Sequence, residues 1–393
     1  MRLSYDSRYP SIEDLRRLAR RRIPRFAFEY LDGGCNEDVN LQRNTNDLRE
    51  VALTPQYLTE HRGSKMRTEL FGHTYDAPFG IAPVGLQGLI WPKSPEILAQ
   101  AAKQHNVPFI LSTVSTSSIE TIAEITEGDF WFQLYHPTED SVRDDIIRRA
   151  KVAGCPVLVI LCDVPTFGYR PRDIRNGLAM PPKMTVRNML QILGRPRWAL
   201  RTLLAGQPNF ETLRPYMPPS LNLKQLGQFM DQTFSGRLNE EKIKPIRDMW
   251  PGKLVLKGVA SVEDAQRAID LGLDGLIVSN HGGRQLDAGP SSIGSLRSIA
   301  DKCRDQITIM MDSGIRSGPD IARTLASGAE FTFLGRAFMY GMAALGSRGG
   351  DHTISILKTQ LQQVMEQICC EQVRDFSKHL APIEAAGVAE THQ

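Results

Sequence analysis

The chain has 393 residues, of which 41% are hydrophobic, and its 47 basic and 44 acidic side chains leave a net charge of +3. This composition is typical of a globular protein with one large domain or two ordinary ones, and so mild a charge gives no reason to expect a nucleic-acid partner. Six cysteines without metal-finger spacing predict reduced thiols and no metal site. The N-terminus lacks a signal-peptide core and no apolar run could span a bilayer, so we expect a cytoplasmic protein.

Two helices are predicted in an N-terminal segment, residues 1–60. Ser11 and Asp14 have the spacing of a capping box, and the apolar residues that follow fall on one face. The other face carries five arginines between residues 16 and 22, which indicates a solvated face, with a membrane or subunit contact as the alternative. A second helix is predicted from Pro24 to Asp32, with Gly33 as its C-cap.

From residue 79 onward, short apolar runs alternate with capped amphipathic segments, which predicts a parallel sheet covered by helices. Eight such runs favour an α/β fold closed as a (β/α)8 TIM barrel in one domain over residues 1–393. An open doubly wound sheet is the alternative, weakened by the absence of a GxGxxG turn after the first strand. The predicted strands are Phe79 to Val84, Pro108 to Ser112, Phe130 to Tyr135, Val157 to Asp163, Leu254 to Val259, Gly275 to Asn280, Thr308 to Asp312 and Phe331 to Gly335.

The interval between the fourth and fifth predicted strands is too long for an ordinary connection, because roughly ninety residues separate Asp163 from Leu254. We interpret residues 165–250 as an insertion on the active-site side of the barrel. Residues 183–214 hold six basic side chains against Glu211 alone, mixed with leucines, methionines and a tryptophan. This mixture suits a peripheral membrane segment, a lid or a subunit contact, and equally an amphipathic helix packed over the barrel mouth.

Residues that suit acid–base chemistry follow several of the predicted strands. His281 and Arg284 follow the sixth strand, where an imidazole can accept a proton beside a guanidinium that binds a carboxylate. Because strand ends share one mouth in a barrel, Asp163 after the fourth strand can pair with His281. Lys257 ends an apolar run, so we expect it to face an anionic cofactor or intermediate, or to form a salt bridge with a neighbouring strand's Asp.

Glycines and arginines follow the last two predicted strands, in Asp312 to Gly318 and in Leu334 to Arg336. In barrels this pair of strand ends commonly forms a phosphate site from backbone N–H groups and a helix N-terminus. We therefore predict that a phosphate group binds there.

Together these motifs resemble the FMN-dependent α-hydroxy acid oxidases and dehydrogenases, a family that includes glycolate oxidase, lactate dehydrogenases and monooxygenases, and mandelate dehydrogenase. The resemblance runs from about Pro24 to Cys369 and rests above all on the stretch Ser279 to Asp287. Further segments that match the family are Ala82 to Gly85, Leu111 to Thr113, Trp131 to Tyr135, Leu256 to Gly258 and Asp312 to Arg316. The segments that look most like the bacterial membrane-associated lactate and mandelate dehydrogenases are Leu31 to Gly34, Ala82 to Gly88, Arg195 to Trp198 and Gly341 after Gly335-Arg336.

The resemblance implies a role for each matching residue. His281 would be the catalytic base with Asp163 as its partner, and Tyr135 would lie near the substrate hydroxyl. The substrate carboxylate would be bound by Tyr30, Arg170 and Arg284. The resemblance assigns the FMN ring to Pro83, Val84, Ser112, Gln133, Lys257 and Ser279, and the ribityl chain and phosphate to Asp312, Gly314, Arg316, Gly335 and Arg336.

Some positions depart from the family pattern or bear on specificity. Leu161 stands where the family usually has a Thr that donates a hydrogen bond to the flavin, so we expect altered flavin contacts with the catalytic set retained. Val114 stands where glycolate oxidases have a bulky Trp, which leaves space for a larger substrate side chain. Phe167 would form another wall of the substrate site.

The implied function is FMN-dependent oxidation of an (S)-2-hydroxy acid, such as lactate or mandelate, to the 2-oxo acid. The electron acceptor would be a quinone, a cytochrome or oxygen, and the resemblance further implies a homotetramer with possible peripheral contact to the inner face of the membrane. Two alternatives from other classes remain open. One is a redox-silent FMN-dependent isomerase, and the other is a flavin-binding, membrane-docking module without turnover.

Overall fold

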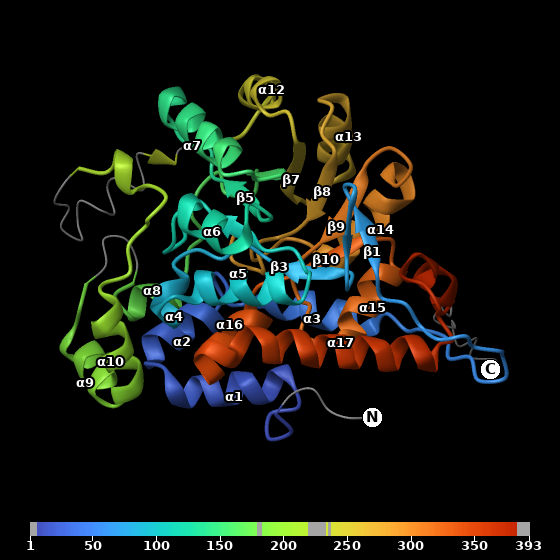
Figure 1. The fold of residues 1–393 in the computed structure, drawn as a ribbon, viewed down its shortest axis with the longest axis horizontal. Helices are drawn as coiled ribbons and strands as arrows, with labels where there is room; N and C mark the ends of the chain where they lie inside the picture. The colour runs from blue at the N-terminus through green and yellow to red at the C-terminus, as the bar shows by residue number, and fades with distance from the viewer. Residues whose placement is uncertain (1–5, 179–182, 219–232, 235–236, 383–393) are drawn as a thin grey trace, which may run out of the picture.

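The computed structural model describes residues 6–178, 183–218, 233–234 and 237–382, and its centre is a parallel eight-stranded sheet (Figure 1). The strands are hydrogen-bonded in the order β3-β10-β9-β8-β7-β6-β5-β4. They are β3 (Phe79–Ile81), β4 (Ile110–Ser112), β5 (Trp131–Leu134), β6 (Val157–Leu161), β7 (Lys253–Val259), β8 (Gly275–Val278), β9 (Thr308–Met311) and β10 (Phe331–Leu334).

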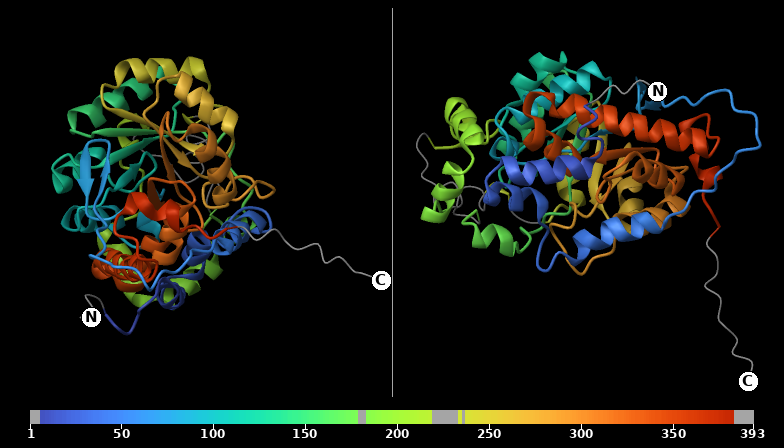
Figure 2. Two further views of the ribbon diagram at one scale, coloured as in Figure 1. Left: turned by 90° about the vertical axis from the view of Figure 1, so that its right-hand side faces the viewer. Right: turned by 90° about the horizontal axis from the view of Figure 1, so that it is seen from below.

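The sheet curls into a barrel because its two end strands also meet. Ile81 of β3 pairs with Phe109, next to β4, and the Ile81 N–H donates to the Pro108 carbonyl at 2.8 Å. Helices surround the strands on the outside (Figure 2). The predicted (β/α)8 barrel is therefore confirmed, and the doubly wound alternative is excluded. Most strands end earlier than predicted, since the residues after them turn into the loops that form the site.

Several helices that follow the strands begin at a capping serine. Ser118, Ser261 and Ser317 each accept a hydrogen bond at the start of the helix that follows. The helices of the outer layer and the C-terminal region are α4 (Gln87–Ile90), α5 (Ser94–Gln104), α6 (Ile119–Thr126), α7 (Asp140–Val152), α12 (Glu240–Met249), α13 (Val262–Asp270), α14 (Ser292–Cys303), α15 (Gly318–Ala326), α16 (Arg336–Leu345), η2 (Gly346–Arg348), α17 (Gly349–Gln367) and η3 (Val373–His379).

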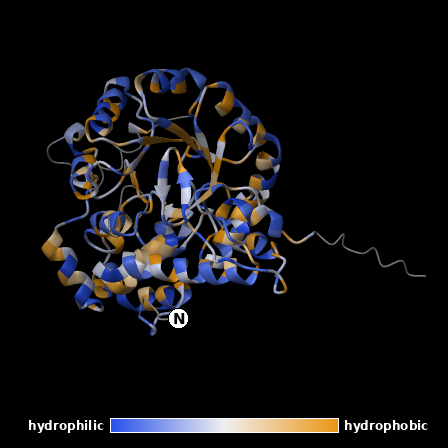
Figure 3. Cartoon of the chain, turned by 45° about the vertical axis from the view of Figure 1, so that its right-hand side comes forward, coloured by the Kyte–Doolittle hydropathy of each residue, from blue (hydrophilic) through white to orange (hydrophobic). Residues whose placement is uncertain are grey.

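The barrel interior is closed at one end by a hairpin that the sequence had not predicted. Strands β1 (Thr68–Leu70) and β2 (His73–Tyr75) pair antiparallel, and the buried Leu70 and Tyr75 pack with the inward residues of the barrel. The Trp131 indole N–H donates to the Tyr75 hydroxyl at 3.3 Å. Apolar colour marks several barrel strands behind this hairpin, whereas the outer helices alternate apolar and polar residues (Figure 3). The hairpin lies at the strands' N-terminal ends, so the site is confined to the other end.

The N-terminal helices pack beside the barrel. Helix α1 (Ile12–Arg22) begins with the predicted cap, because the Asp14 N–H donates to Ser11 Oγ at 3.1 Å, and it packs against α16. The arginine face of α1 is not wholly solvated, since Arg16 forms a 2.7 Å ion pair with Asp32. Helix α2 (Arg25–Asp32) follows, and Gly33 is its C-cap in an extended conformation. Helix α3 (Val39–Glu50) completes the segment.

The long interval after β6 contains a pair of short helices beside the barrel mouth. Its elements are α8 (Pro171–Arg175), α9 (Val186–Leu193), α10 (Pro196–Ala205), η1 (Arg214–Tyr216) and then α12. Ile243 and Ile246 of α12 are buried in the main core, so α12 serves as the outer-layer helix before β7 and we propose to end the insertion ahead of it. The rest of the predicted 165–250 segment lies partly outside the described residues. Among the helices described, none has the length and apolarity needed to cross a membrane.

Candidate active site

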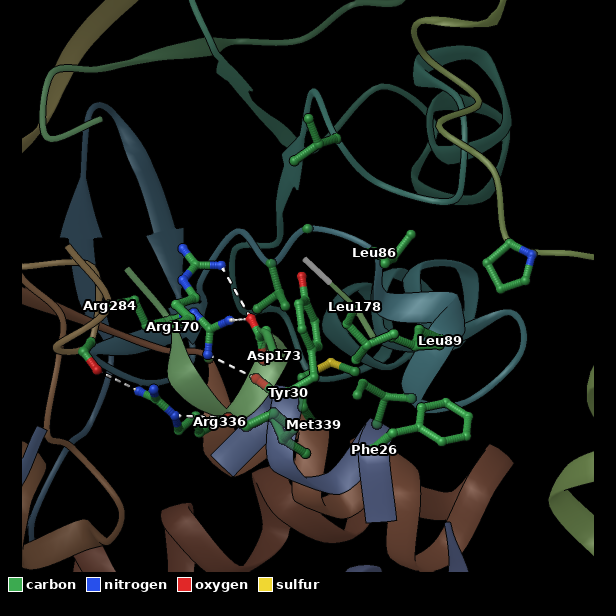
Figure 4. A pocket seen from close by; sticks show the side chains of 18 of the residues that line it. Phe26, Tyr30, Leu86, Leu89, Arg170, Asp173, Leu178, Arg284, Arg336 and Met339 are labelled. Atoms are coloured by element: carbon green, nitrogen blue, oxygen red, sulfur yellow. Dashed lines mark hydrogen bonds and ion pairs between the residues drawn. The ribbon is translucent and has the colours of Figure 1, made fainter. Parts of the chain in front are cut away.

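A cavity of about 1020 Å³ opens at the C-terminal ends of the strands (Figure 4). Charged side chains from the strand ends and α8 form one side, and apolar side chains of α2, α4, α9 and α10 form the other. Most residues predicted to bind substrate or FMN line this one space. They are Tyr30, Pro83, Val84, Val114, Tyr135, Phe167, Arg170, Lys257, His281, Arg284, Asp312, Gly314, Arg316, Gly335 and Arg336.

The predicted base and its carboxylate partner meet at the cavity wall. His281 Nδ1 lies 3.2 Å and 3.3 Å from the two carboxylate oxygens of Asp163, which sits behind the ring. Burial lowers the pKa of His281 below its ordinary value, although Asp163 favours the protonated ring. Burial also disfavours the Asp163 carboxylate, but the nearby His281 and Lys257 outweigh it and lower that pKa. At neutral pH the ring is therefore a neutral base whose Nε2 is left to accept a proton.

Lys257 is held by a buried polar group beside the same wall. Its Nζ lies 3.0 Å from Asp312 Oδ2 and donates to Ser279 Oγ at 3.0 Å, and the Ser279 hydroxyl donates to Asp312 Oδ1 at 2.5 Å. Burial disfavours the ammonium, but the Asp312 and Asp163 carboxylates outweigh it and raise the pKa of Lys257. The salt bridge that the sequence left as an alternative is thus present, and the ammonium also lines the cavity.

Two arginines and a carboxylate occupy the predicted substrate-carboxylate position (Figure 4). Asp173 Oδ2 lies 3.9 Å from Arg170 Nη1 and 3.8 Å from Arg284 Nη2. Arg284 Nη1 donates to the carbonyls of Tyr30 and Gly33 at 2.8 Å and 2.7 Å, and its guanidinium lies over the Tyr30 ring. Burial and the neighbouring Arg170 lower the pKa of Arg284 to about 10. Because Arg170 Nε is buried without a hydrogen-bond partner, this cluster retains donors for an anionic ligand.

The far end of the cavity is electropositive. Arg316 and Arg336 both line it, and burial together with Arg316 and Arg284 lowers the pKa of Arg336 to about 9. The Arg336 guanidinium donates to the carbonyls of Leu31, Gly33 and Gly282 at 2.8–2.9 Å. Gly282 has a left-handed φ of +68°, and a Cβ there would also displace this guanidinium, so the position favours glycine. Cations that repel one another around a cavity favour a phosphate ligand.

Some predicted residues lie behind the cavity wall. Ser112, Gln133 and Ser279 are buried at strand ends, Asp163 is half-buried, and none of the four lines the open space. Leu161 is also buried, at the end of β6, where it pairs in register with Lys257. Burial and the Asp163 carboxylate raise the pKa of Tyr135, so its phenol stays protonated at neutral pH.

The apolar side of the cavity was largely missed by sequence reasoning. Phe26, Leu86, Leu89 and Leu178 face the charged cluster across Tyr30 (Figure 4). Asp173 was missed as well, although its position three residues after Arg170 at the start of a helix was a usable signal. The apolar residues gave no such signal, because helix residues that face a cavity and those that face the core share one periodicity.

The residues present fit an FMN group. The cavity joins a phosphate-attracting end at Arg316 and Arg336, a wall that includes Gly314 and Gly335, and a buried ammonium at Lys257. A flavin needs these three environments for its phosphate, its ribityl chain and the electron-rich edge of its ring. The space that remains toward His281 and Arg284 is then available for a small acid.

Comparisons with known proteins agree with this geometry. The family model described as FMN-dependent dehydrogenase matches residues 19–382. An L-lactate dehydrogenase of Xanthomonas axonopodis pv. citri is 38% identical over 93% of this chain and 94% of its own, and one of Vibrio parahaemolyticus is 36% identical over 93% and 96%. A crystal structure of the monotopic membrane protein (S)-mandelate dehydrogenase has a TM-score of 0.89 at 34% identity, covering 94% of this chain and 98% of that one. The chain belongs to the FMN-dependent dehydrogenase family, and it is an FMN-dependent oxidoreductase of 2-hydroxy acids.

Proposed function

We propose that the enzyme oxidises an (S)-2-hydroxy acid with a medium to large side chain, of the lactate or mandelate kind, and passes the electrons to a quinone. The observation that carries this proposal is the meeting of the His281–Asp163 pair with Arg170 and Arg284 at one cavity. Two guanidinium groups can bind an acid by its carboxylate, and a neutral imidazole beside them can then remove a proton from the bound acid.

Each part of the site has a distinct role in this proposal. Arg170, Arg284 and Tyr30 bind the substrate carboxylate, and Tyr135 lies near the hydroxyl. His281 accepts a proton at Nε2, while Asp163 holds the ring by Nδ1 and stabilises its protonated form. When bound, FMN supplies the two-electron acceptor. Lys257, fixed by Asp312 and Ser279, provides positive charge against the electron-rich edge of the ring.

The proposed FMN contacts follow from the same wall. Arg316 and Arg336 bind the phosphate, and Gly314 and Gly335 line the cavity beside them. The remaining proposed contacts to the flavin are Pro83, Val84, Ser112, Gln133 and Ser279 for the ring and Asp312 for the ribityl chain.

The apolar side of the cavity supports a substrate larger than glycolate. Val114 is a small wall residue, and Phe167, which is 44% exposed, stands at the opening. Beyond them the cavity continues along Leu86 and Leu89 to the inner faces of α9 and α10. An aromatic or branched side chain would be desolvated there, and each buried methylene group adds roughly 0.8 kcal/mol.

The same apolar extension favours a quinone as electron acceptor. From the charged cluster the cavity reaches Ile192 on α9 and Trp198 on α10. A quinone is an apolar ring that enters from a membrane, so it needs an apolar route to the flavin. A cytochrome needs only an exposed protein surface near the flavin, and oxygen needs no apolar route. We propose that the quinone approaches the flavin along this face.

The outer face of the same helix pair supports peripheral membrane binding. Leu190, Leu193, Leu203 and Leu204 are between 65% and 80% exposed, and Arg187 and Arg201 lie among them. An amphipathic pair with leucines outward and arginines beside them suits the surface of an anionic bilayer. We further propose a homo-oligomer, a tetramer by family resemblance, which light scattering of the purified holoenzyme tests.

A substrate panel under anaerobic conditions tests the proposed function. Glycolate, (S)-lactate, (S)-2-hydroxyisocaproate and (S)-mandelate are mixed with the FMN-loaded enzyme while the flavin absorbance is followed. We expect bleaching that is faster with the larger acids than with glycolate. The reduced enzyme should then be reoxidised faster by a short-chain quinone than by oxygen. Bound flavin that no hydroxy acid bleaches would favour the isomerase or the module without turnover.

A further inference from the structure

A second cavity, distinct from the active site, lies beside the exposed leucines of α10. Its volume is about 690 Å³, within the range of roughly 300–1,000 Å³ that is usual for small-molecule sites. Its walls come from the end of α1, the turn before α5, the outer side of α10 and the turn after α16 (Figure 1). These segments are far apart in sequence, so the cavity exists only because α10 is docked against the barrel.

The charge of this cavity has one sign. Arg22, Lys93, Arg197 and Arg201 line it, and no carboxylate is among the lining residues. Within the described parts of the chain, none of these four cations forms an ion pair with an Asp or Glu. Burial and the neighbouring Arg197 lower the pKa of Arg22, which indicates mutual repulsion. Such a cluster would be stabilised by an anion with several acceptor oxygens.

Arg22 is held in place at the inner wall. Its Nη1 donates to the Ala344 carbonyl, and its guanidinium carbon lies 5.3 Å from the centre of the Trp91 ring, which is itself buried. A cation stacked on an indole and fixed by a carbonyl is pre-organised for a ligand. Arg197 and Arg201, one turn apart on α10, are exposed at the opposite wall.

The rest of the cavity is apolar and continuous with the proposed membrane face. Leu200 and Leu204 line it on the same helix and are 58% and 75% exposed. Helices α9 and α10 protrude from the body of the molecule beside it (Figure 2). Cations on two facing walls, with leucines beside them, match a molecule with an anionic head and an apolar tail.

We propose that this second cavity binds the headgroup of an anionic phospholipid, with its phosphate between Arg22, Arg197 and Arg201 and its first acyl segment along Leu200 and Leu204. The inference rests on the membrane docking proposed above, and it adds lipid selectivity to that docking. General attraction of basic residues to an anionic surface requires no particular geometry, whereas a built site distinguishes headgroups and depends on the cations that line it.

Monomeric short-chain lipids test the site without a bilayer. Dihexanoylphosphatidylglycerol and dihexanoylphosphatidylcholine, below their micelle concentrations, are titrated into the full-length FMN-loaded enzyme by calorimetry. We expect the anionic lipid to bind at least about tenfold more tightly than the zwitterionic one. The double variant Arg197→Gln/Arg201→Gln should lose at least about tenfold in affinity for the anionic lipid. The double variant Arg20→Gln/Arg49→Gln removes the same charge outside the cavity and should bind within about twofold of wild type.

Three results would overturn the proposal. Equal losses in the two double variants would reduce the effect to diffuse electrostatics. Inorganic phosphate binding as tightly as the anionic lipid would make the cavity a phosphate site. No binding of either short-chain lipid would remove the site altogether. Flavin bleaching by hydroxy acid, measured on the same samples, reports separately on the proposed oxidation, and its failure would leave these binding results interpretable.

Discussion

His281 owes its position to an unusual backbone. Its φ is +58°, and Gly282 and Gly283 continue in the left-handed region at +68° and +73°. A non-glycine residue adopts this conformation only at some energetic cost, which the surroundings must offset. Here the His281 N–H donates to Ser279 Oγ at 3.1 Å, the same hydroxyl that Lys257 contacts. The turn therefore links the base directly to the buried group that we assign to the flavin.

The pH dependence of kcat/KM should report on this base. Neutral His281 is the active form, and because its pKa lies below the ordinary value near 6.5, activity should fall only as the pH drops below about that value. Asp163 favours the protonated ring, so Asp163→Asn should move this acidic limb to still lower pH while kcat falls. An acidic limb that moves to higher pH in the variant would contradict the assignment of Asp163.

Asp173 should weaken substrate binding, because its carboxylate shares the two arginines with the substrate carboxylate. In Asp173→Asn we expect KM for the hydroxy acid to fall about fivefold, equivalent to ~1 kcal/mol, with kcat changed less than roughly twofold. Asp248→Asn removes the same charge from the exposed face of α12 and serves as control. A rise in KM would instead assign Asp173 to positioning the arginines.

Sequence reasoning reached His281 and Asp163 because strand ends in a barrel share one mouth. It could not find the backbone strain at His281, since the local sequence permits several turns. Nor could it tell which cation Asp173 would meet, because side-chain pairing across loops depends on tertiary packing. The catalytic roles of these residues stay predictions until variants are measured.

At the scale of elements, the β1–β2 hairpin determines which end of the barrel is open. Tyr75 is buried against Phe331, with ring centroids 5.8 Å apart, and accepts a hydrogen bond from Trp131. The sequence before residue 79 gave no strand prediction because each strand has only three residues. Such short segments form through the packing that they find on the barrel rather than through their own propensity.

Truncation of Tyr75 should therefore lower stability without altering the chemistry. We expect Tyr75→Ala to reduce the free energy of unfolding of the holoenzyme by roughly 3 kcal/mol, measured by denaturant titration. Tyr57→Ala, at a side chain that is 70% exposed, should change it by less than about 0.5 kcal/mol. The rate of flavin reduction in the folded Tyr75 variant should match wild type. A slow rate there would mean that the hairpin acts on the active site.

At the scale of the whole molecule, the insertion connects the barrel mouth with the outer surface. Trp198 of α10 donates to the Ile90 carbonyl at 3.0 Å and packs edge-to-face on Phe26, and Gln191 of α9 accepts from the Phe26 N–H at 3.0 Å. The sequence indicated the insertion and its amphipathic character. It could not indicate the docking onto α2, because these contacts join residues more than a hundred positions apart.

One face of the helix pair packs over the cavity, as one of the two interpretations of the sequence expected, and the other face is exposed, so membrane binding stays a prediction. We expect Leu190→Ser/Leu193→Ser to reduce co-sedimentation with anionic vesicles at least about tenfold, because each leucine loses roughly 1.5–3 kcal/mol of burial in the bilayer. Leu58→Ser/Val152→Ser alters two residues elsewhere that are still more exposed, and it should leave binding unchanged. Equal loss in both variants would remove the proposed membrane face.

The central claim is that His281 is the base in FMN-dependent oxidation of a 2-hydroxy acid. Its most direct test is anaerobic stopped-flow reduction of the FMN-loaded His281→Ala variant by (S)-lactate and (S)-mandelate, beside wild type and the control His61→Ala. We predict that the variant keeps its flavin spectrum and that its reduction slows at least about 10³-fold, while the control matches wild type. Reduction of the His281 variant at the wild-type rate would contradict the account.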